Sequence, residues 1–208
     1  MQQNPALHIP CEKITGLILA GGAGTRMQGQ DKGLLELGGK TLVQVQIEAL
    51  KPFVQEILIS ANRHLEKYAQ LGCAVVPDIV PGFAGPLTGL ASLLQQTSKE
   101  YAICLPCDTP LLPDNLIPAL WQTLQQQNLD YVYVRCRNKE QPLLACMRTS
   151  VRDSLETYLQ SGNDRVFAWV KTLRSIAINI EVQNWELQNI NATEQLINVT
   201  SALAMLKR

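Results

Sequence analysis

Residues 14–32 read ITGLILAGGAGTRMQGQDK, and this stretch decides how the chain folds. It opens with a short apolar run over 14–19, which is typical of a buried strand, and passes directly into a segment with four glycines. Glycine lets the backbone adopt positive φ angles and approach a phosphate closely, so that several peptide N–H groups can point at one anion. A tight surface turn would explain one or two glycines, but not the basic residues Arg26 and Lys32 that follow. The stretch therefore predicts an anion-binding loop at the end of a strand.

Two familiar nucleotide-binding motifs do not fit this region. A dinucleotide fingerprint requires a further glycine three residues after Gly24, where the chain has Met27. Residues 39–41 read GKT and resemble the end of a phosphate-binding P-loop, but the glycine required five residues before them is Leu34. We therefore interpret Lys40 as a charge on a hairpin.

Short apolar runs alternate with longer amphipathic segments along most of the chain, which is typical of strand-helix-strand units and a mostly parallel sheet. We predict a single-domain, doubly wound α/β fold over residues 14–208, with residues 1–13 as a disordered tail. The predicted strands are 14–19, 56–60, 74–76, 101–105, 131–135 and 175–180. Helices are expected after Thr41, Asn62, Leu87, Pro113, Thr149 and Ala192, with Thr41, Thr149 and Asn191 as N-caps. Hairpins are expected near Gly38 and near Asn138, and the second adds a small antiparallel extension through residues 143–147.

The composition narrows the possible functions. The 18 Lys and Arg residues balance the 18 Asp and Glu residues, so no overall field exists to hold nucleic acid, and any anion must be bound locally. The first 13 residues lack the apolar core of a signal peptide, and no segment approaches the roughly 20 apolar residues that cross a bilayer. We therefore expect a cytoplasmic protein with no membrane or nucleic-acid partner, and six cysteines that are free thiols.

An acidic residue follows the predicted strand over 101–105. Asp108 lies between Pro106 and Pro110, which restrict the backbone and hold the turn rigid. In an open α/β sheet the carboxyl ends of parallel strands border one crevice, so Asp108 is expected to face the glycine-rich loop. Mg²⁺ typically takes one or two protein carboxylates together with phosphate oxygens and water. Asp108 is thus a candidate metal ligand, and a turn-forming aspartate that bonds its own backbone is the alternative.

Cys104 and Cys107 form a CxxC pair. A structural zinc would need a second ligand pair, which the other four cysteines do not supply. A redox pair is expected at a helix N-terminus, whereas Cys104 lies inside an apolar run. We predict that both thiols are buried packing residues.

The segment LAGG at 19–22, followed by a spaced Arg, Met and Asp-Lys, resembles the signature of molybdenum cofactor guanylyltransferases. The resemblance continues through SANRH at 60–64, GPL at 85–87 and PCDTP at 106–110, in similar order and spacing, and covers about residues 14–200. Family members usually have Arg-Met-Gly, whereas here Gln28 precedes Gly29. The spacing to Lys32 is kept, so phosphate binding is expected to survive this change.

The resemblance implies a Rossmann-like nucleotidyltransferase fold and a set of site residues. Arg26, Lys32 and Asp108 would be catalytic, with Mg²⁺ on Asp108. The implied GTP contacts are Leu19, Ala20, Gly21, Gly22, Lys32, Asn62, Asp78 and Asp108. Taken alone, Asn62 is more often a helix cap and Asp78 a turn residue. The implied pterin-side residues are Gln141, Pro142, Asp164, Arg165, Asn189 and Asn191.

The resemblance also implies the reaction, which is the transfer of GMP from GTP to the molybdenum-molybdopterin cofactor. Cytidylyl-transferring relatives usually read LAAG where this chain reads LAGG at 19–22, which favours guanine. The residues alone leave two alternatives open, namely a cytidylyl- or sugar-1-phosphate nucleotidyltransferase of the same fold and a non-catalytic nucleotide- or cofactor-binding carrier. Proteins that handle molybdopterin or mature molybdoenzymes are the expected protein partners.

Overall fold

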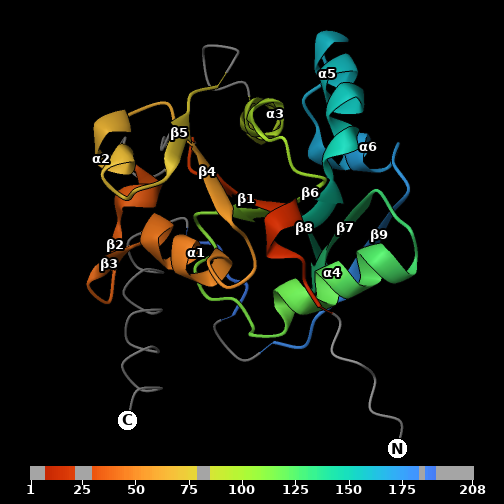
Figure 1. Ribbon diagram of the computed structural model, residues 1–208, viewed down its shortest axis with the longest axis horizontal. Helices are drawn as coiled ribbons and strands as arrows, with labels where there is room; N and C mark the ends of the chain where they lie inside the picture. The colour runs from red at the N-terminus through yellow and green to blue at the C-terminus, as the bar shows by residue number, and fades with distance from the viewer. Residues whose placement is uncertain (1–7, 22–29, 79–84, 183–185, 191–208) are drawn as a thin grey trace, which may run out of the picture.

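A seven-stranded sheet runs through the computed structural model, which describes residues 8–21, 30–78, 85–182 and 186–190 (Figure 1). The strand order is β5-β4-β1-β6-β8-β7-β9, and every neighbouring pair is parallel except the two that involve β8. The strands are β1 (Ile14–Leu19), β4 (Glu56–Ser60), β5 (Ala74–Val76), β6 (Tyr101–Pro106), β7 (Tyr131–Cys136), β8 (Lys139–Arg148) and β9 (Ser175–Asn179). The predicted α/β fold with a mostly parallel sheet and a small antiparallel part is confirmed.

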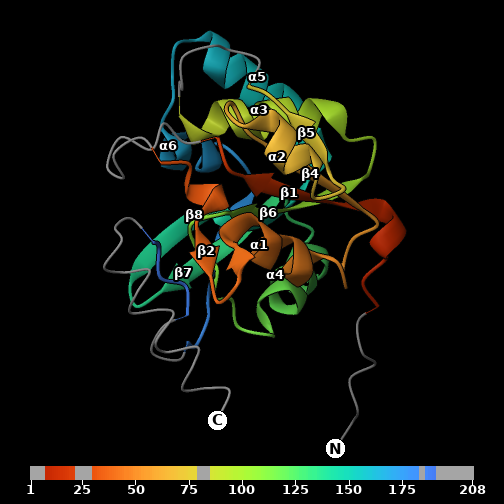
Figure 2. The same ribbon diagram turned by 90° about the vertical axis from the view of Figure 1, so that its left-hand side faces the viewer.

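Helices cover both faces of the sheet (Figures 1 and 2). One face carries α3 (Pro86–Gln96), α5 (Arg152–Gln160) and α6 (Val166–Val170), and the other carries α1 (Leu42–Leu50) and α4 (Leu116–Gln126). The short α2 (Leu65–Ala69) lies beside β5. The remaining elements are η1 (Cys11–Lys13), η3 (Lys32–Leu34), η4 (Thr149–Val151) and the small hairpin β2 (Glu36–Leu37) with β3 (Lys40–Thr41).

The central strands read as continuous apolar runs because both of their faces are buried. All six residues of β1 are buried. Leu17 and Leu19 pack toward α3, whereas Ile14 and Ile18 pack toward α1 and α4. The alternation of side chains along the strand therefore supplies two separate cores from one sequence segment.

Several local predictions are confirmed. Thr41 caps α1 through a capping box, in which its hydroxyl accepts from the Gln44 backbone N–H while the Gln44 side chain accepts from the Thr41 N–H. Lys40 lies on the β2-β3 hairpin and pairs with Glu48 at 2.7 Å, as expected for a hairpin charge.

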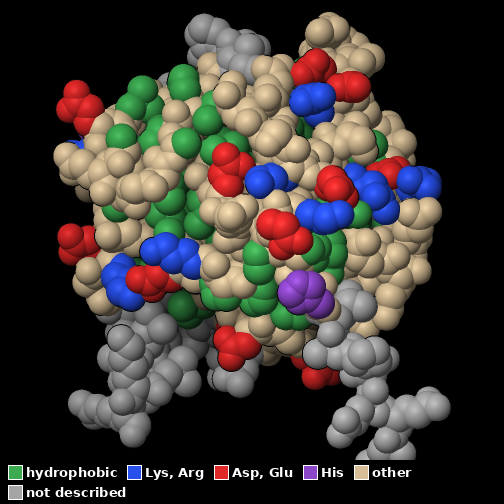
Figure 3. Space-filling model, in the orientation of Figure 1, with side chains coloured by type: hydrophobic (Ala, Val, Ile, Leu, Met, Phe, Trp, Pro, Cys, Tyr) green, Lys and Arg blue, Asp and Glu red, His purple; other side chains and the backbone are tan. Residues whose placement is uncertain are grey.

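Charges of both signs are interspersed over the face shown in Figure 3.

Other predictions are wrong or lie outside the described residues. Thr149 does not cap α5, because its hydroxyl donates to the Lys99 carbonyl and Val151 precedes the helix instead. Residues 11–13 form η1, although they were expected in a disordered tail. Helix α6 was not predicted from the sequence. The helix expected after Ala192 and the N-cap at Asn191 fall on residues that the structure does not describe.

The antiparallel strand β8 is longer than predicted and contains a bulge. It begins at Lys139, and its register with β7 shifts so that Val134 pairs with Gln141 while Tyr133 pairs with Ala145. Residues 142–144 have no partner on β7 and bend the strand. The hydroxyl of the buried Tyr131 donates to the Pro142 carbonyl at 2.6 Å and fixes this bend.

Candidate active site

A pocket of about 760 Å³ opens at the carboxyl ends of β1, β4 and β6, where it also meets the first half of β8. This is the edge of an open α/β sheet at which ligands bind. Residues from four regions line it: Leu19, Ala20, Gly21 and Lys32; Ser60, Asp78, Gly85, Pro86 and Gly89; Pro106, Cys107, Asp108 and Asn189; and residues 139–144. The volume falls within the usual range for a small-molecule site, about 300–1,000 Å³.

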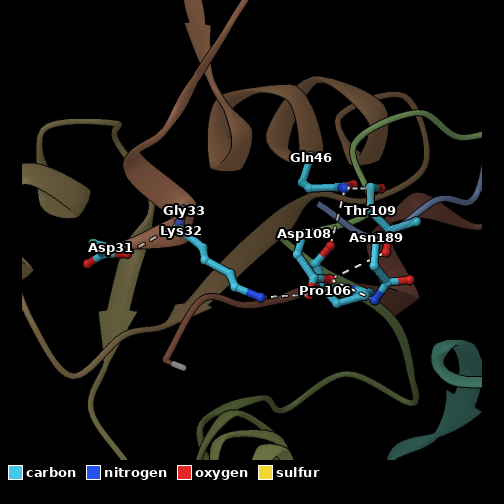
Figure 4. Close-up of polar contacts among 8 residues, drawn as sticks. All are labelled: Asp31, Lys32, Gly33, Gln46, Pro106, Asp108, Thr109 and Asn189. Carbon is cyan, nitrogen blue, oxygen red and sulfur yellow. Dashed lines mark hydrogen bonds and ion pairs between the residues drawn. The ribbon is translucent and has the colours of Figure 1, made fainter. Parts of the chain in front are cut away.

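Asp108 and Lys32 face each other inside this pocket (Figure 4). Lys32 Nζ lies 3.5 Å from Asp108 Oδ2, and each side chain is about one-fifth exposed. The hydroxyl of Thr109 and the amide of Asn189 donate to Asp108 Oδ1 over 3.4 and 3.3 Å. These three contacts are long for hydrogen bonds to a charged carboxylate. The carboxylate is therefore held in place without being saturated by short bonds, as a metal ligand requires.

The turn that carries Asp108 is anchored on both sides. The Gln46 side chain, which is buried on α1, donates to the Pro106 carbonyl at 3.2 Å and to the Thr109 carbonyl at 2.6 Å (Figure 4). The N–H of Ile190 donates to the Asp108 carbonyl at 2.6 Å, which brings residues 186–190 to the pocket. One amide thus ties helix α1 to both ends of the turn.

Asp78 is the centre of a second polar network in the wall of the pocket. Its carboxylate accepts from the Ser60 hydroxyl at 3.0 Å and the Asn62 amide at 2.7 Å. The Thr88 hydroxyl lies 3.4 Å from the same carboxylate and donates to the Gly85 carbonyl at 2.6 Å. The Asn62 side chain also accepts from the Asp78 N–H and donates to the Gly21 carbonyl. Asp78 therefore joins β4, α3 and the end of β1.

This polar network packs closely against two glycines. A Cβ at Gly21 would lie 3.0 Å from Asn62 Nδ2, and a Cβ at Gly89 would lie 2.6 Å from Ser60 Oγ. Substitution at Gly89 would displace the Ser60 hydroxyl from Asp78. These glycines keep the backbones of the first loop and of α3 close to the polar centre.

Comparisons with known proteins identify the family. Residues 16–175 match the model of the MobA-like NTP transferase domain. The molybdenum cofactor guanylyltransferase of Shewanella baltica (strain OS185) is 37% identical over 183 residues, which are 88% of this chain and 93% of the relative. The chain belongs to the molybdenum cofactor guanylyltransferases. A second relative of that name, from Shewanella sediminis, is 34% identical over 92% of this chain and 98% of its own length.

Solved structures confirm the nucleotidyltransferase fold of this guanylyltransferase family member. Molybdopterin-guanine dinucleotide biosynthesis protein A from Archaeoglobus fulgidus superimposes with a TM-score of 0.77 at 20% identity, covering 92% of this chain and 99% of that protein. A 4-diphosphocytidyl-2C-methyl-D-erythritol synthase from Anaerococcus prevotii gives a TM-score of 0.73 at 13% identity, covering 94% and 98%. At these identities the likeness concerns the fold alone.

The structure brings most of the predicted site residues of this guanylyltransferase family member together. Leu19, Ala20, Gly21, Lys32, Asp78, Asp108, Gln141, Pro142 and Asn189 line the pocket, and Asn62 lies behind it. Asp164 and Arg165 are exposed residues just before α6 and are not among the lining residues that the structure describes, so the structure does not place them with the pocket. Gly22, Arg26 and Asn191 lie outside the described residues.

Sequence reasoning missed several residues that shape this site. Gln46, Asp31 and Tyr68 hold the two segments that carry Asp108 and Lys32. Gln46 is a polar residue in the buried face of an amphipathic helix. A polar side chain at an apolar position of the sequence pattern could have indicated that it has a buried hydrogen-bond partner. Tyr68 offers no such signal, because its partner lies 37 residues away in the sequence.

The CxxC pair is buried, as predicted. Cys104 and Cys107 are free thiols with almost no exposed surface. Burial raises the pKa of Cys104 to about 12 and also raises that of Cys107, whose thiolate the neighbouring Asp108 carboxylate disfavours further. Among the residues that the structure describes, no three His, Cys, Asp or Glu side chains come together as a metal cluster. None of the described helices has the length and apolar character that a membrane crossing needs.

Proposed function

We propose that this pocket transfers GMP from GTP to the molybdenum-molybdopterin cofactor, forming molybdopterin guanine dinucleotide and pyrophosphate. The observation that carries the proposal is the opposition of Lys32 and Asp108 in one pocket, in a chain of the guanylyltransferase family. Nucleotidyl transfer needs a cation for the triphosphate and a carboxylate for a divalent metal at adjacent positions, and this pair supplies both.

The two ends of the pocket suit the two substrates. Leu19, Ala20 and Gly21 at the end of β1 would contact the nucleotide, and Lys32 would bind the triphosphate from η3. Arg26 would add a second cation from the same segment. The residues 139–144 of β8 line the opposite end, which leaves that end for the pterin. Asn189 would lie between the substrates, since it contacts Asp108.

Asp108 fits a magnesium ion because its carboxylate is a hard oxygen ligand held at the tip of β6 with only long hydrogen bonds. When bound there, the metal would supply positive charge to the α- and β-phosphates. Asp108 would fix its position, and Asn189, Thr109 and Lys32 would hold the Asp108 side chain. Asp78 is less suited to this role, because the Ser60 hydroxyl and the Asn62 amide donate to its carboxylate over 3.0 and 2.7 Å, which is shorter than any of the three contacts of Asp108.

The reaction then needs no protein base. A terminal phosphate of the acceptor is largely dianionic near neutral pH, since its second pKa is about 6. One of its oxygens attacks the α-phosphorus of GTP, a new P–O–P linkage forms, and the bond to pyrophosphate breaks. Lys32 would stabilise the charge that develops on the leaving group. Positioning and electrostatics therefore account for catalysis.

A nucleotide and acceptor panel tests the proposal. Pyrophosphate release is measured with GTP, CTP or ATP, each with molybdopterin or a sugar 1-phosphate, with and without Mg²⁺. Turnover with GTP and molybdopterin that requires Mg²⁺ supports the proposal, and turnover only with CTP or a sugar phosphate overturns it. Binding of GTP without any pyrophosphate release would instead indicate a non-catalytic carrier. Proteins that deliver the pterin or receive the product belong to the same proposal and are sought by co-purification from the cytoplasm.

A further inference from the structure

A tyrosine that does not line the pocket is hydrogen-bonded to the segment that carries Lys32. Tyr68, on α2, has no exposed surface, and its hydroxyl donates to Asp31 Oδ1 at 2.6 Å. The same oxygen accepts from the Gly33 N–H at 3.2 Å, so Asp31 caps η3. The Tyr68 hydroxyl and the Gly33 N–H therefore converge on one carboxylate oxygen of Asp31, the residue directly before Lys32.

The packing around Gly33 shows how closely η3 is held. A Cβ at Gly33 would lie 2.3 Å from the Tyr68 hydroxyl and 3.2 Å from the Cβ of Ala20. The backbone of η3 is thus sandwiched between Tyr68 and the end of β1, and only glycine fits between them. Because Ala20 lines the pocket, this contact sets the distance between η3 and the nucleotide end of the pocket.

Asp31 and Lys32 point in opposite directions from the chain (Figure 4). Asp31 turns toward Tyr68, and Lys32 extends toward Asp108. Fixing one of two adjacent side chains fixes the backbone they share, and this limits where the long lysine side chain can reach. A lysine side chain is long and has many rotamers, so its ammonium group is placed accurately only when its backbone is fixed.

The charge of Asp31 is not needed for this arrangement. Its Oδ1 atom acts only as an acceptor for an O–H and an N–H, and an asparagine oxygen could accept both bonds. Burial and the hydrogen bond to Asp31 raise the pKa of Tyr68, so its hydroxyl stays a donor through the neutral range. The contact is therefore a positional link and not an ion pair.

We propose that Tyr68 and Asp31 are positioning residues that hold η3 so that Lys32 meets the triphosphate of the bound nucleotide. The inference rests on the proposed function, because it assigns Lys32 to the triphosphate. It predicts that removing the Tyr68 hydroxyl weakens nucleotide binding through Lys32, although neither Tyr68 nor Asp31 lines the pocket.

A double-mutant cycle tests this by GTP titration calorimetry in the presence of Mg²⁺, without acceptor. Tyr68→Phe should weaken GTP binding about fivefold to tenfold, since it removes one hydrogen bond and leaves Asp31 Oδ1 with a single donor. Lys32→Ala should weaken binding more. In the Lys32→Ala background, Tyr68→Phe should change the affinity less than about twofold, because the two substitutions act through the same group. Equal losses in both backgrounds would overturn the inference.

Two further variants separate position from charge and from general stability. Asp31→Asn should bind GTP within about twofold of the unaltered protein, whereas Asp31→Ala should match or exceed the loss seen in Tyr68→Phe. Tyr101→Phe is the matched control, because Tyr101 is a buried tyrosine at the opposite end of β6 whose hydroxyl accepts from Arg148. It should leave the GTP affinity unchanged.

The outcomes separate this inference from the proposed function. If the unaltered protein binds no GTP, both are overturned. If Lys32→Ala weakens GTP binding while Tyr68→Phe does not, only the positioning role of Tyr68 is overturned. A loss in Asp31→Asn as large as that in Asp31→Ala would also count against the positional link, because it would assign the effect to the carboxylate charge.

Discussion

Lys32 Nζ lies 3.5 Å from Asp108 Oδ2, although the two residues are 76 positions apart and come from segments on opposite sides of one pocket. The buried Tyr68 and the partly buried Asp31 hold the segment of Lys32, and the buried Gln46 holds the turn of Asp108. The cation and the carboxylate that the proposed reaction needs are therefore set at a fixed separation before any substrate arrives.

Asp108→Asn should abolish magnesium-dependent turnover and leave the fold intact. The asparagine oxygen can still accept from Asn189 and Thr109, so the turn keeps its bonds, but the charge that holds the metal is lost. We expect pyrophosphate release to fall about 100-fold or more, with a thermal midpoint near that of the unaltered protein. Unchanged turnover would remove Asp108 from the site, and loss of the folded state would show that its role is structural.

Gln46→Leu should reduce both stability and turnover. It leaves the carbonyls of Pro106 and Thr109 without their side-chain donor, at a cost of about 1–3 kcal/mol in the free energy of unfolding. Because Asp108 lies between these carbonyls, its position should loosen and kcat should fall. Urea unfolding and steady-state kinetics measure the two effects.

Gln125→Leu is the control for Gln46→Leu. Gln125 Nε2 is buried and has no hydrogen-bond partner among the described residues, and it lies on α4. An apolar replacement there removes a donor that is not used, so stability should stay the same or rise and turnover should not change. A similar loss of kcat in both variants would indicate that the effect of Gln46 is not specific to the turn.

The ion pair of Asp130 should make the free energy of unfolding depend on pH in the acidic range. Arg174 donates two hydrogen bonds to its carboxylate, at 2.9 and 2.6 Å, and lowers the pKa of Asp130 below its usual value of 3.8. A lowered folded pKa contributes stability that is complete above the unfolded value and is lost as the pH falls through the folded value. Asp130→Asn should therefore lower the free energy of unfolding by about 0.2–1 kcal/mol at pH 7, and the difference should shrink as the pH falls below 3.8 and vanish once the pH is below the lowered pKa of Asp130.

The matched control for this pair is Asp153→Asn. Asp153 contacts Arg152 at 3.4 Å and its side chain is 86% exposed, so this substitution should have no measurable effect at neutral or acidic pH. A difference between Asp130→Asn and the unaltered protein that does not shrink as the pH falls below 3.8 would contradict the assignment to the ion pair.

Thiol labelling should distinguish the buried CxxC pair from the partly exposed Cys11 and Cys73. At pH 8, Cys11 should react first and Cys73 more slowly, because partial burial raises the pKa of Cys73. Cys104 and Cys107 should react only after unfolding, since both are buried and protonated. Mass spectrometry of peptides labelled in the native state counts the modified sites, and rapid labelling of Cys104 would contradict its burial.

The strands could be predicted from the sequence because burial on both faces leaves a plain signal. The run over β1 and the run over β6 contain no exposed residue, and a strand covered on two sides is mostly apolar. Helix α6 escaped prediction because five residues make little more than one turn, which is too short to show helical periodicity. Thr149 resembles an N-cap in composition, but its hydroxyl bonds to the carbonyl of a distant segment instead.

Some residues of the candidate site could likewise be predicted from the sequence, and others could not. Asp108 and the glycine-rich segment could be predicted because each follows a strand whose carboxyl end must reach the same edge of the sheet. Tyr68, Asp31 and Gln46 could not, because their roles depend on contacts between segments that only the folded chain brings together. The bonds from Ser60 and Asn62 to the Asp78 carboxylate could not be predicted either, because they join residues that are 16 to 18 positions apart in the sequence.

The reversed direction of β8 makes one wall of the pocket replaceable. The hairpin between β7 and β8 starts the reversed strand at the rim of the pocket, and the bend at residues 142–144 pushes its backbone inward. Lengthening, shortening or exchanging that hairpin would reshape the wall that we assign to the acceptor without altering β1, η3 or the turn after β6. We therefore expect that grafting this hairpin between relatives would change which acceptor is used and leave the residues proposed to handle the nucleotide in place.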